Sequence, residues 1–281
     1  MVNQLQKYLV QNRFQMREEE NYIEINRENW NGRVDSHLKS DFYNVEGFVN
    51  GENSLNSIEL DLLGDLKGKS VLHLQCHFGQ DSIQMSRMGA KVTGVDLSDE
   101  AINAAKELTE RCTQDTNFIC CDLFDLPNHL NEEFDLVFAS YGTIGWLPDI
   151  ERWGTLVGKY LKKGGRFVFA EFHPTVWMFD EDFKSVAYNY FKSDAIVENE
   201  QGTYADKEAD FVNTSVSWNH SLSSVVTTLL NNGLEIEVLQ EFDYSPYNCF
   251  SGTIKVAERK YRIESMGNKL PMVYAIKATK K

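Results

Sequence analysis

Short apolar strands and amphipathic helices alternate through the middle of this chain, and this alternation is the feature that most constrains the fold. The pattern predicts strands over 71–75, 91–96, 117–121, 134–140 and 166–172, with helices over 80–88, 99–112 and 149–161. A helix over 222–231 and strands over 234–242 and 272–278 continue it after a break. Strands that alternate with helices of this length form βαβ units, so we expect a parallel sheet with right-handed crossovers.

Two aromatic, glycine-punctuated segments break the alternation. Residues 1–60 predict an N-terminal helical cap, with helices in 1–30 and 57–66 around an irregular stretch, 31–54. Residues 174–219 predict an antiparallel insertion. Long irregular segments in a compact domain are usually functional or disordered, and a high aromatic content argues against disorder. We therefore expect one domain over 1–281, in which 31–54 and 174–219 cover the active site from opposite sides, the insertion acting as a substrate lid.

Charge and composition narrow the possible partners. The 28 basic and 42 acidic residues give a net charge of −14, which argues against nucleic acid as a partner. No apolar run reaches the length that spans a bilayer, and the start of the chain lacks the apolar region of a signal peptide, so we expect a cytoplasmic protein without a membrane partner. The basic stretch 253–281 is either a solvated face or an attractor for an anionic substrate. The five cysteines form no C-x-x-C pair, so reduced thiols and no metal are expected.

Polar residues follow each of the five central strands at the point where it ends. These segments are Gln75–Gly79, Asp96–Ser98, Cys121–Leu123, Ser140–Thr143 and Glu171–Pro174. In open parallel sheets, ligands bind beyond the carboxyl ends of the strands, where the strand order reverses. The candidate site therefore lies among these segments.

The chain resembles the class I S-adenosylmethionine-dependent methyltransferases over roughly 65–173. The resemblance rests on the order of these five strand-end segments and on the stretches VLHLQCHFGQDS, SYGTIGWLPD and EFHPTVWMFD. The first strand of that family runs into D-x-G-x-G-x-G, which here reads His73-Leu74-Gln75-Cys76-His77-Phe78-Gly79. Only the last glycine is kept, and this variant first motif, VLHLQCHFG, has His73 in place of the acid. The resemblance implies a Rossmann-like α/β fold: a mainly parallel seven-stranded sheet with its last strand antiparallel and helices on both faces.

The resemblance also implies a cofactor site for S-adenosyl-L-methionine, with S-adenosyl-L-homocysteine as the product. Asp96 would accept both ribose hydroxyls, or else serve only as a helix N-terminal charge. Asp122 would accept from the adenine amino group, or be an ordinary loop aspartate. The expected cofactor residues are Gln75, Cys76, His77, Gly79, Asp96, Leu97, Cys121, Asp122, Leu123, Ser140 and Tyr141. Ser140 and Tyr141 would line the methionine arm, although Tyr141 could equally pack in the core.

Beside the cofactor, His173 is the candidate general base, because Pro174 disfavours helical geometry there and imidazole titrates near neutral pH. Glu171, two residues earlier, would orient the His173 ring or bind an acceptor amine. The alternative is that His173 only packs and that catalysis relies on proximity. The expected substrate-binding residues are Trp30, His37, Tyr43, Trp146 and Trp177.

The function that follows is methyl transfer to a small-molecule acceptor. One alternative is a non-catalytic module that binds a nucleotide or S-adenosylmethionine, with the substituted glycines marking lost chemistry. Another is an NAD-dependent dehydrogenase, which is less favoured because G-x-G-x-x-G is absent. The sequence does not identify the acceptor or the oligomeric state.

Overall fold

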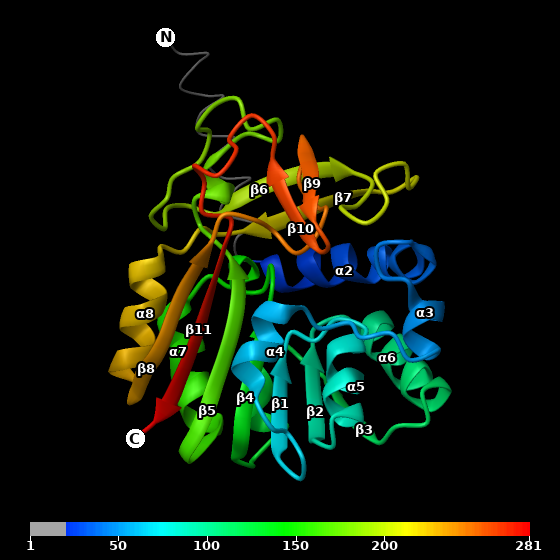
Figure 1. Ribbon diagram of the computed structural model, residues 1–281, viewed down its shortest axis with the longest axis vertical. Helices are drawn as coiled ribbons and strands as arrows, with labels where there is room; N and C mark the ends of the chain where they lie inside the picture. Colours follow the sequence, from blue (N-terminus) through cyan, green and yellow to red (C-terminus); the bar gives the residue numbers. More distant parts are fainter. Residues whose placement is uncertain (1–20) are drawn as a thin grey trace.

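The computed structural model describes residues 21–281 and contains a seven-stranded sheet of order β3-β2-β1-β4-β5-β11-β8 (Figure 1). Its strands are β1 (Ser70–Leu74), β2 (Lys91–Asp96), β3 (Thr116–Cys120), β4 (Phe134–Ser140), β5 (Leu161–Phe172), β8 (Leu234–Phe242) and β11 (Val273–Lys280). The last strand, β11, runs antiparallel to both of its neighbours, β5 and β8. The expected Rossmann-like sheet with an antiparallel last strand is thus confirmed, and that strand lies inside the sheet.

The strand order reverses at β1, which pairs in parallel with β2 on one side and β4 on the other. Val71 is opposite both Val92 and Leu136, so the three strands end at the same edge of the sheet. Figure 1 shows this edge facing α2 and the smaller hairpins. The residues that follow β1, β2 and β4 are therefore brought together there.

Helices cover both faces of the sheet, and the helices of each face pack on apolar side chains of that face. On one face lie α4 (Ser57–Leu63), α5 (Gln80–Arg87) and α6 (Asp99–Arg111), and on the other the short 3₁₀ helix η1 (Leu123–Asn128), α7 (Ile150–Tyr160) and α8 (Leu222–Asn231). Ser98 is the N-cap residue of α6, since its hydroxyl accepts from the backbone N–H of Ala101 at 3.0 Å. Two further 3₁₀ turns, η2 (Ile144–Trp146) and η3 (Val176–Met178), follow β4 and β5.

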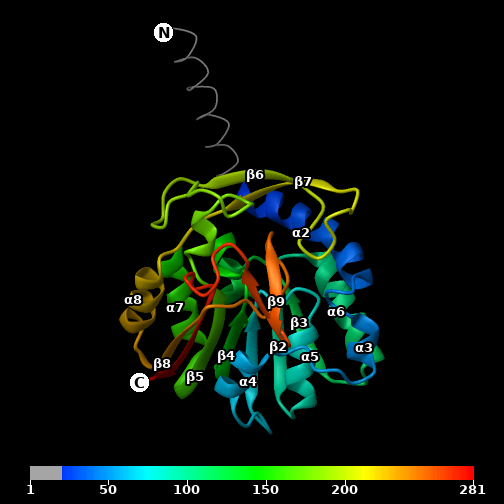
Figure 2. The ribbon, with the colours of Figure 1, turned by 45° about the horizontal axis from the view of Figure 1, so that its top comes forward.

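A cap made of α2 (Tyr22–Lys39), α3 (Val45–Val49) and the hairpin of β6 (Ile196–Gln201) and β7 (Val212–Ser217) covers the strand ends. The side-chain amide of Asn26 donates to Val216 O at 2.8 Å and accepts from Val216 N at 3.0 Å. Asn29 donates to Thr214 O at 2.9 Å. The cap helix and the insertion therefore form one joined layer (Figure 2). That 31–54 and 174–219 cover the active site from opposite sides stays a prediction. Residues 1–20 of the expected cap lie outside the described residues.

A second hairpin, β9 (Thr253–Ala257) and β10 (Lys260–Ile263), stands where the sequence predicts only a long loop. At its turn, the Arg259 guanidinium donates to the carbonyl oxygens of Asn53 at 2.7 Å and Leu55 at 3.1 Å. This hairpin therefore fastens the C-terminal part of the chain to the segment before α4.

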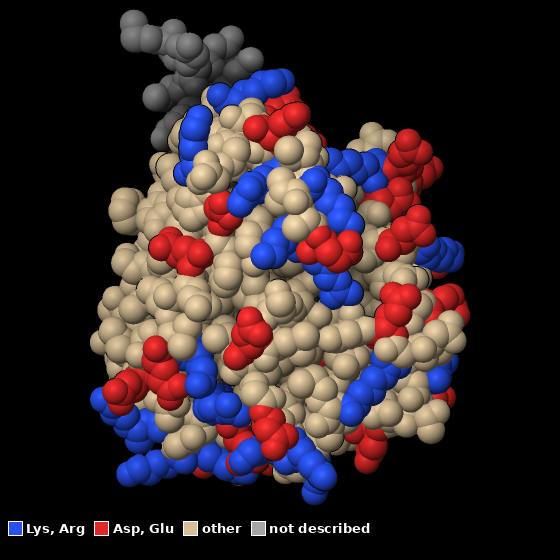
Figure 3. All heavy atoms as spheres, in the orientation of Figure 1, with Lys and Arg blue, Asp and Glu red and all other residues tan. Residues whose placement is uncertain are grey.

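The basic stretch 253–281 pairs extensively with neighbouring acids. Its ion pairs are Lys255–Glu258, Arg262–Asp243, Lys277–Glu237, Lys280–Glu133 and Lys281–Glu235. Figure 3 shows basic and acidic side chains interspersed over one face of the molecule. These contacts favour the interpretation of this stretch as a solvated face. No helix within 21–281 has the length and apolar character needed to cross a membrane.

Candidate active site

The loop after β1 keeps the backbone of a glycine-rich loop although two of its glycines are replaced. Gln75, His77 and Gly79 have φ angles of 53°, 51° and 77°, all in the left-handed region. For a residue with a Cβ atom this region costs roughly 1–2 kcal/mol. At Gly79 a side chain is excluded by packing as well, because a Cβ atom would lie 2.7 Å from the Phe118 ring.

Asp96, at the end of β2, is bonded directly to this loop. Its carboxylate accepts from the backbone N–H of His77 at 2.7 Å and of Ser98 at 2.9 Å. Burial raises the pKa of Asp96, and the backbone hydrogen bonds from Ser98, His77 and Leu97 oppose that rise. Each carboxylate oxygen can accept more than one hydrogen bond, so these contacts leave acceptor capacity for ribose hydroxyls.

The other expected cofactor residues lie around the same edge. Cys76, Cys121 and Leu123 are buried, and Leu97 is partly buried. Asp122 accepts from the backbone N–H of Phe124 at 2.8 Å and begins η1, and burial raises its pKa. Ser140 donates to Asp81 at 3.4 Å. The buried His73 contacts Ser82 Oγ at 2.8 Å, as a core histidine would.

Tyr141 contacts an acidic group that the sequence analysis did not identify. Its hydroxyl donates to Oε2 of Glu59 at 2.9 Å, and Glu59 is fully buried. Burial, followed by the nearby charge of Asp81, raises the pKa of Glu59 to about 7. The sequence signal was the spacing of Asn56 and Glu59, which is a helix-capping pair on α4.

Glu171 holds the loop after β4. One carboxylate oxygen accepts from the backbone N–H groups of Gly142 and Phe172, and the other from the N–H of Thr143 at 2.7 Å, the Thr143 hydroxyl at 3.0 Å and the N–H of Ile144 at 3.3 Å. Burial raises the pKa of Glu171 and these hydrogen bonds oppose the rise. The expectation that Glu171 orients the His173 ring is wrong, because the loop donors occupy its carboxylate.

His173 is directed toward the far edge of the sheet. Its Nδ1 atom lies 2.9 Å from the Thr175 hydroxyl, and its Nε2 atom lies 2.9 Å from Oε1 of Glu241 on β8. Burial lowers the pKa of His173, and the Glu241 charge opposes this. These contacts give His173 a structural role at the ends of β5 and β8, and its role as a base stays a prediction.

Four of the five expected substrate-binding residues gather beside His77. Ring-centroid distances from His77 are 5.2 Å to Trp30, 5.1 Å to His37 and 5.6 Å to Tyr43, and Trp146 lies 5.3 Å from Trp30. Trp177 is apart from them.

The Trp177 ring packs instead on Phe172 and Phe250, at 5.7 and 5.6 Å, and is 41% exposed. Phe172 in turn packs 5.5 Å from Tyr141. Trp177 therefore belongs to the aromatic group around Tyr141 rather than to the one around His77.

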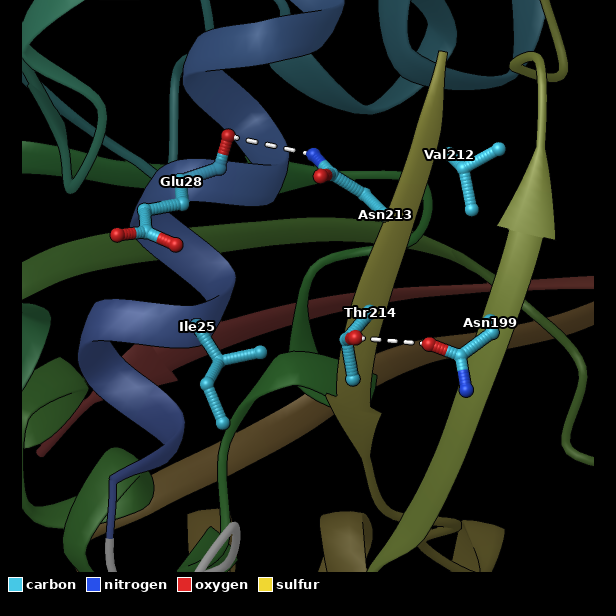
Figure 4. A pocket seen from close by; sticks show the side chains of 6 residues that line it. All are labelled: Ile25, Glu28, Asn199, Val212, Asn213 and Thr214. Carbon is cyan, nitrogen blue, oxygen red and sulfur yellow. Dashed lines mark hydrogen bonds between the residues drawn. The ribbon is translucent and has the colours of Figure 1, made fainter.

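A hollow of about 240 Å³ lies between α2 and the β6–β7 hairpin (Figure 4). It is lined by Ile25, Glu28, Asn199, Val212, Asn213 and Thr214, which include none of the expected site residues. Within 21–281, no group of three or more His, Cys, Asp or Glu side chains is arranged to hold a metal ion.

The residues at the strand ends fit S-adenosylmethionine. Gln75, His77 and Gly79 keep the left-handed backbone conformation that glycine adopts most readily. The carboxylate of Asp96 stands at the end of β2, and two buried atoms of the loop, Gln75 Oε1 and His77 Nδ1, have no hydrogen-bond partner among the described residues.

Comparison with known proteins agrees with this arrangement. Residues 71–165 match the model of a methyltransferase domain family. The chain is 30% identical over 138 residues to a ubiquinone biosynthesis O-methyltransferase of Coxiella burnetii, covering 48% of this chain and 58% of that protein. It is 32% identical over 133 residues to an uncharacterized methyltransferase of Synechocystis sp., covering 47% and 60%. The chain thus spans somewhat more than half the length of these relatives.

Solved structures share the fold. A putative S-adenosylmethionine-dependent methyltransferase of Listeria monocytogenes superposes with a TM-score of 0.56 at 21% identity, covering 79% of this chain and 95% of that one. The strand order, the loop after β1, the acid at the end of β2 and the family match all lead to one assignment. Residues 71–165 match a methyltransferase domain family, and the chain has the fold of class I S-adenosylmethionine-dependent methyltransferases.

Proposed function

We propose that this protein transfers the methyl group of S-adenosylmethionine to a small-molecule acceptor. The observation that carries the proposal is the bond between Asp96 and the left-handed loop at His77, 2.7 Å long, which joins the expected ribose acceptor to the expected backbone cradle. The sulfonium of the bound donor supplies an activated methyl group, so the protein must mainly orient the reactants and exclude water.

The chain's own residues divide this work. Asp96 would accept from the ribose, and Asp122, at the end of β3, from the adenine amino group. Glu171 holds residues 142–144 in place beside the donor site. The cap over the strand ends would shield the reacting groups from water.

His173→Ala tests the base role, with the expected loss on the order of 10²–10⁴-fold in rate if His173 takes a proton.

Replacement of Asp96 tests the cofactor site. Asp96→Ala removes the acceptor of the ribose hydroxyls, and each hydrogen bond to a charged group contributes about 1.5–3 kcal/mol. The affinity for S-adenosylhomocysteine, measured by calorimetry, should fall at least about tenfold. Glu107→Ala, at an exposed position on α6, is the matched control. Unchanged affinity in a folded Asp96→Ala protein would show that Asp96 does not bind the cofactor.

Turnover separates an enzyme from a binding module. Pools of small phenols, amines and thiols are incubated with S-adenosylmethionine, and S-adenosylhomocysteine formation is measured. Hydroxyl acceptors come first, because the Coxiella relative is named an O-methyltransferase. Tight cofactor binding without product from any pool would favour the non-catalytic alternative. We also propose that the protein acts in the cytoplasm, since its five free cysteines suit a reducing compartment.

A further inference from the structure

Arg33 is a buried cation without a well-matched partner. Its side chain is 5% exposed, and its one ion pair within 21–281 is a 3.4 Å contact with Glu200, a residue whose side chain is 55% exposed. The guanidinium carbon lies 5.3 Å from the centre of the Trp30 ring and 5.9 Å from that of Trp146. Its Nε atom is buried and has no hydrogen-bond partner within 21–281. A buried charge is costly unless it is paired and hydrogen-bonded, so this arrangement favours an additional anion.

A histidine pair lies beside this cation. His37 is fully buried, and its Nδ1 atom lies 2.8 Å from Nε2 of His77. Burial lowers the pKa of both rings, and the charge of Arg33 lowers both further, so both are neutral near pH 7. In a neutral pair one ring donates to the other. One of the two outer nitrogens then carries a proton and the other is a bare acceptor, whichever tautomers are present.

The outer atoms of this pair, His37 Nε2 and His77 Nδ1, are buried and also lack partners in the described part of the chain. Within 21–281, five of the buried side-chain nitrogen and oxygen atoms that lack a hydrogen-bond partner belong to Asn29, Arg33, His37, Gln75 and His77. These residues come only from α2 and the loop after β1. Because more than about 90% of buried polar groups are normally bonded, this concentration indicates a ligand between the cap and the loop.

We propose that Arg33, with His37 and His77, binds a carboxylate of one of the reacting molecules. The proposal rests on the proposed function. The planar guanidinium fork matches a carboxylate better than a single positive charge does, and the one N–H at the outer end of the histidine pair adds a donor. The carboxylate comes either from the methionine part of the donor or from an acidic acceptor bound beside Trp30 and Trp146, whose rings pack against each other.

Calorimetry with three probes distinguishes these sources. S-adenosylhomocysteine carries the amino-acid carboxylate, 5′-methylthioadenosine lacks it, and salicylate is a flat aromatic carboxylate that is added to protein saturated with S-adenosylhomocysteine. The variant is Arg33→Met, which keeps most of the side-chain volume and removes the charge. If the donor supplies the carboxylate, this variant loses at least about tenfold in affinity for S-adenosylhomocysteine and binds 5′-methylthioadenosine like wild type.

If the acceptor supplies the carboxylate, Arg33→Met binds both nucleosides like wild type, whereas salicylate binds the wild type and loses at least about tenfold in affinity for the variant. The proposal is overturned if the variant matches wild type with all three probes, including the case in which salicylate binds neither protein. Should Arg33→Met fail to fold, Arg33→Lys takes its place, with a smaller loss expected because the charge remains without the fork.

The same titrations distinguish a failure of this proposal from a failure of the proposed cofactor site. Asp96→Ala should weaken both nucleosides, since both contain the ribose, whereas Arg33→Met should weaken at most the one with a carboxylate. Wild-type protein that binds neither nucleoside would refute the proposed function, and salicylate binding that depends on Arg33 would still identify a carboxylate site.

Discussion

The buried carboxyl group of Glu59 should make the protein less stable as the pH rises. Its pKa is raised from 4.5 to about 7, by burial first and then by the charge of Asp81. The folded state therefore holds this proton more tightly than the unfolded state does. The stability contributed by the protonated group is complete below pH 4.5 and is lost as the pH rises toward 7. At 1.36 kcal/mol per pH unit, the loss amounts to about 3 kcal/mol.

Glu59→Gln removes this dependence and keeps the contacts. Asn56 donates to Oε1 of Glu59 from its backbone at 3.3 Å and from its side chain at 3.2 Å, and a glutamine oxygen can accept both bonds. The glutamine amide then faces the Tyr141 hydroxyl, which can accept as well as donate. The variant should be more stable than wild type by up to about 3 kcal/mol at pH 8 and nearly equal to it at about pH 4.5.

Urea unfolding followed by tryptophan fluorescence measures the free energies of unfolding of wild type and Glu59→Gln from about pH 4.5 to pH 8. The difference between wild type and Glu59→Gln isolates this one group, because the other titrating groups are common to both proteins. Glu107→Gln, exposed on α6, provides the control, and its stability relative to wild type should not change with pH. A difference that stays constant from about pH 5 to pH 8, or a wild type that is the more stable protein at pH 8, would refute the reasoning.

Three further outcomes follow from the site. Gln75→Gly should be about 1 kcal/mol more stable than Gln75→Ala, because only glycine adopts the left-handed backbone without strain. Equal free energies of unfolding in urea would show that residue 75 carries no such strain. Burial lowers the pKa of His73 to about 3, so its contribution is complete above pH 6.5 and is lost as the pH falls toward 3. His73→Gln should therefore lose less stability in acid, and an acid profile like that of wild type would contradict this. Glu171→Gln should destabilise the protein by about 3 kcal/mol or more and speed amide hydrogen exchange at 142–144; unchanged exchange would count against the anchoring role.

The central fold could be predicted because its signals are local. The apolar run ending at Asp96, the glycine at 79 and the cap at Ser98 each follow from spacing and backbone chemistry, and the structure contains all three. Strand order then follows from the crossover rules, which is why the residues at the ends of β1, β2 and β4 could be expected at one edge.

A helical cap was predicted, but the extension of α2 to Lys39, into the stretch expected to be irregular, could not be, because α2 buries polar side chains. Asn26, Asn29, Arg33 and His37 face the interior, so the helix has no apolar period to recognise. The β9–β10 hairpin was missed because its turn contains Glu258 and Arg259 rather than the glycine or asparagine that marks most tight turns. Partners such as Gly142 for Glu171 depend on tertiary packing, which no local pattern encodes.

The asparagine contacts of α2 also bear on self-association. A two-stranded hairpin offers open backbone groups along both edges, which is the usual template for strand addition by another copy. On β7, the amides of Asn26 and Asn29 occupy part of that edge by bonding to Val216 and Thr214, in the manner of a third strand. The helix thus protects the hairpin from edge-to-edge aggregation. Loss of these amides would leave this edge of β7 open to strand addition by another copy, and the first visible defect would be the formation of larger oligomers.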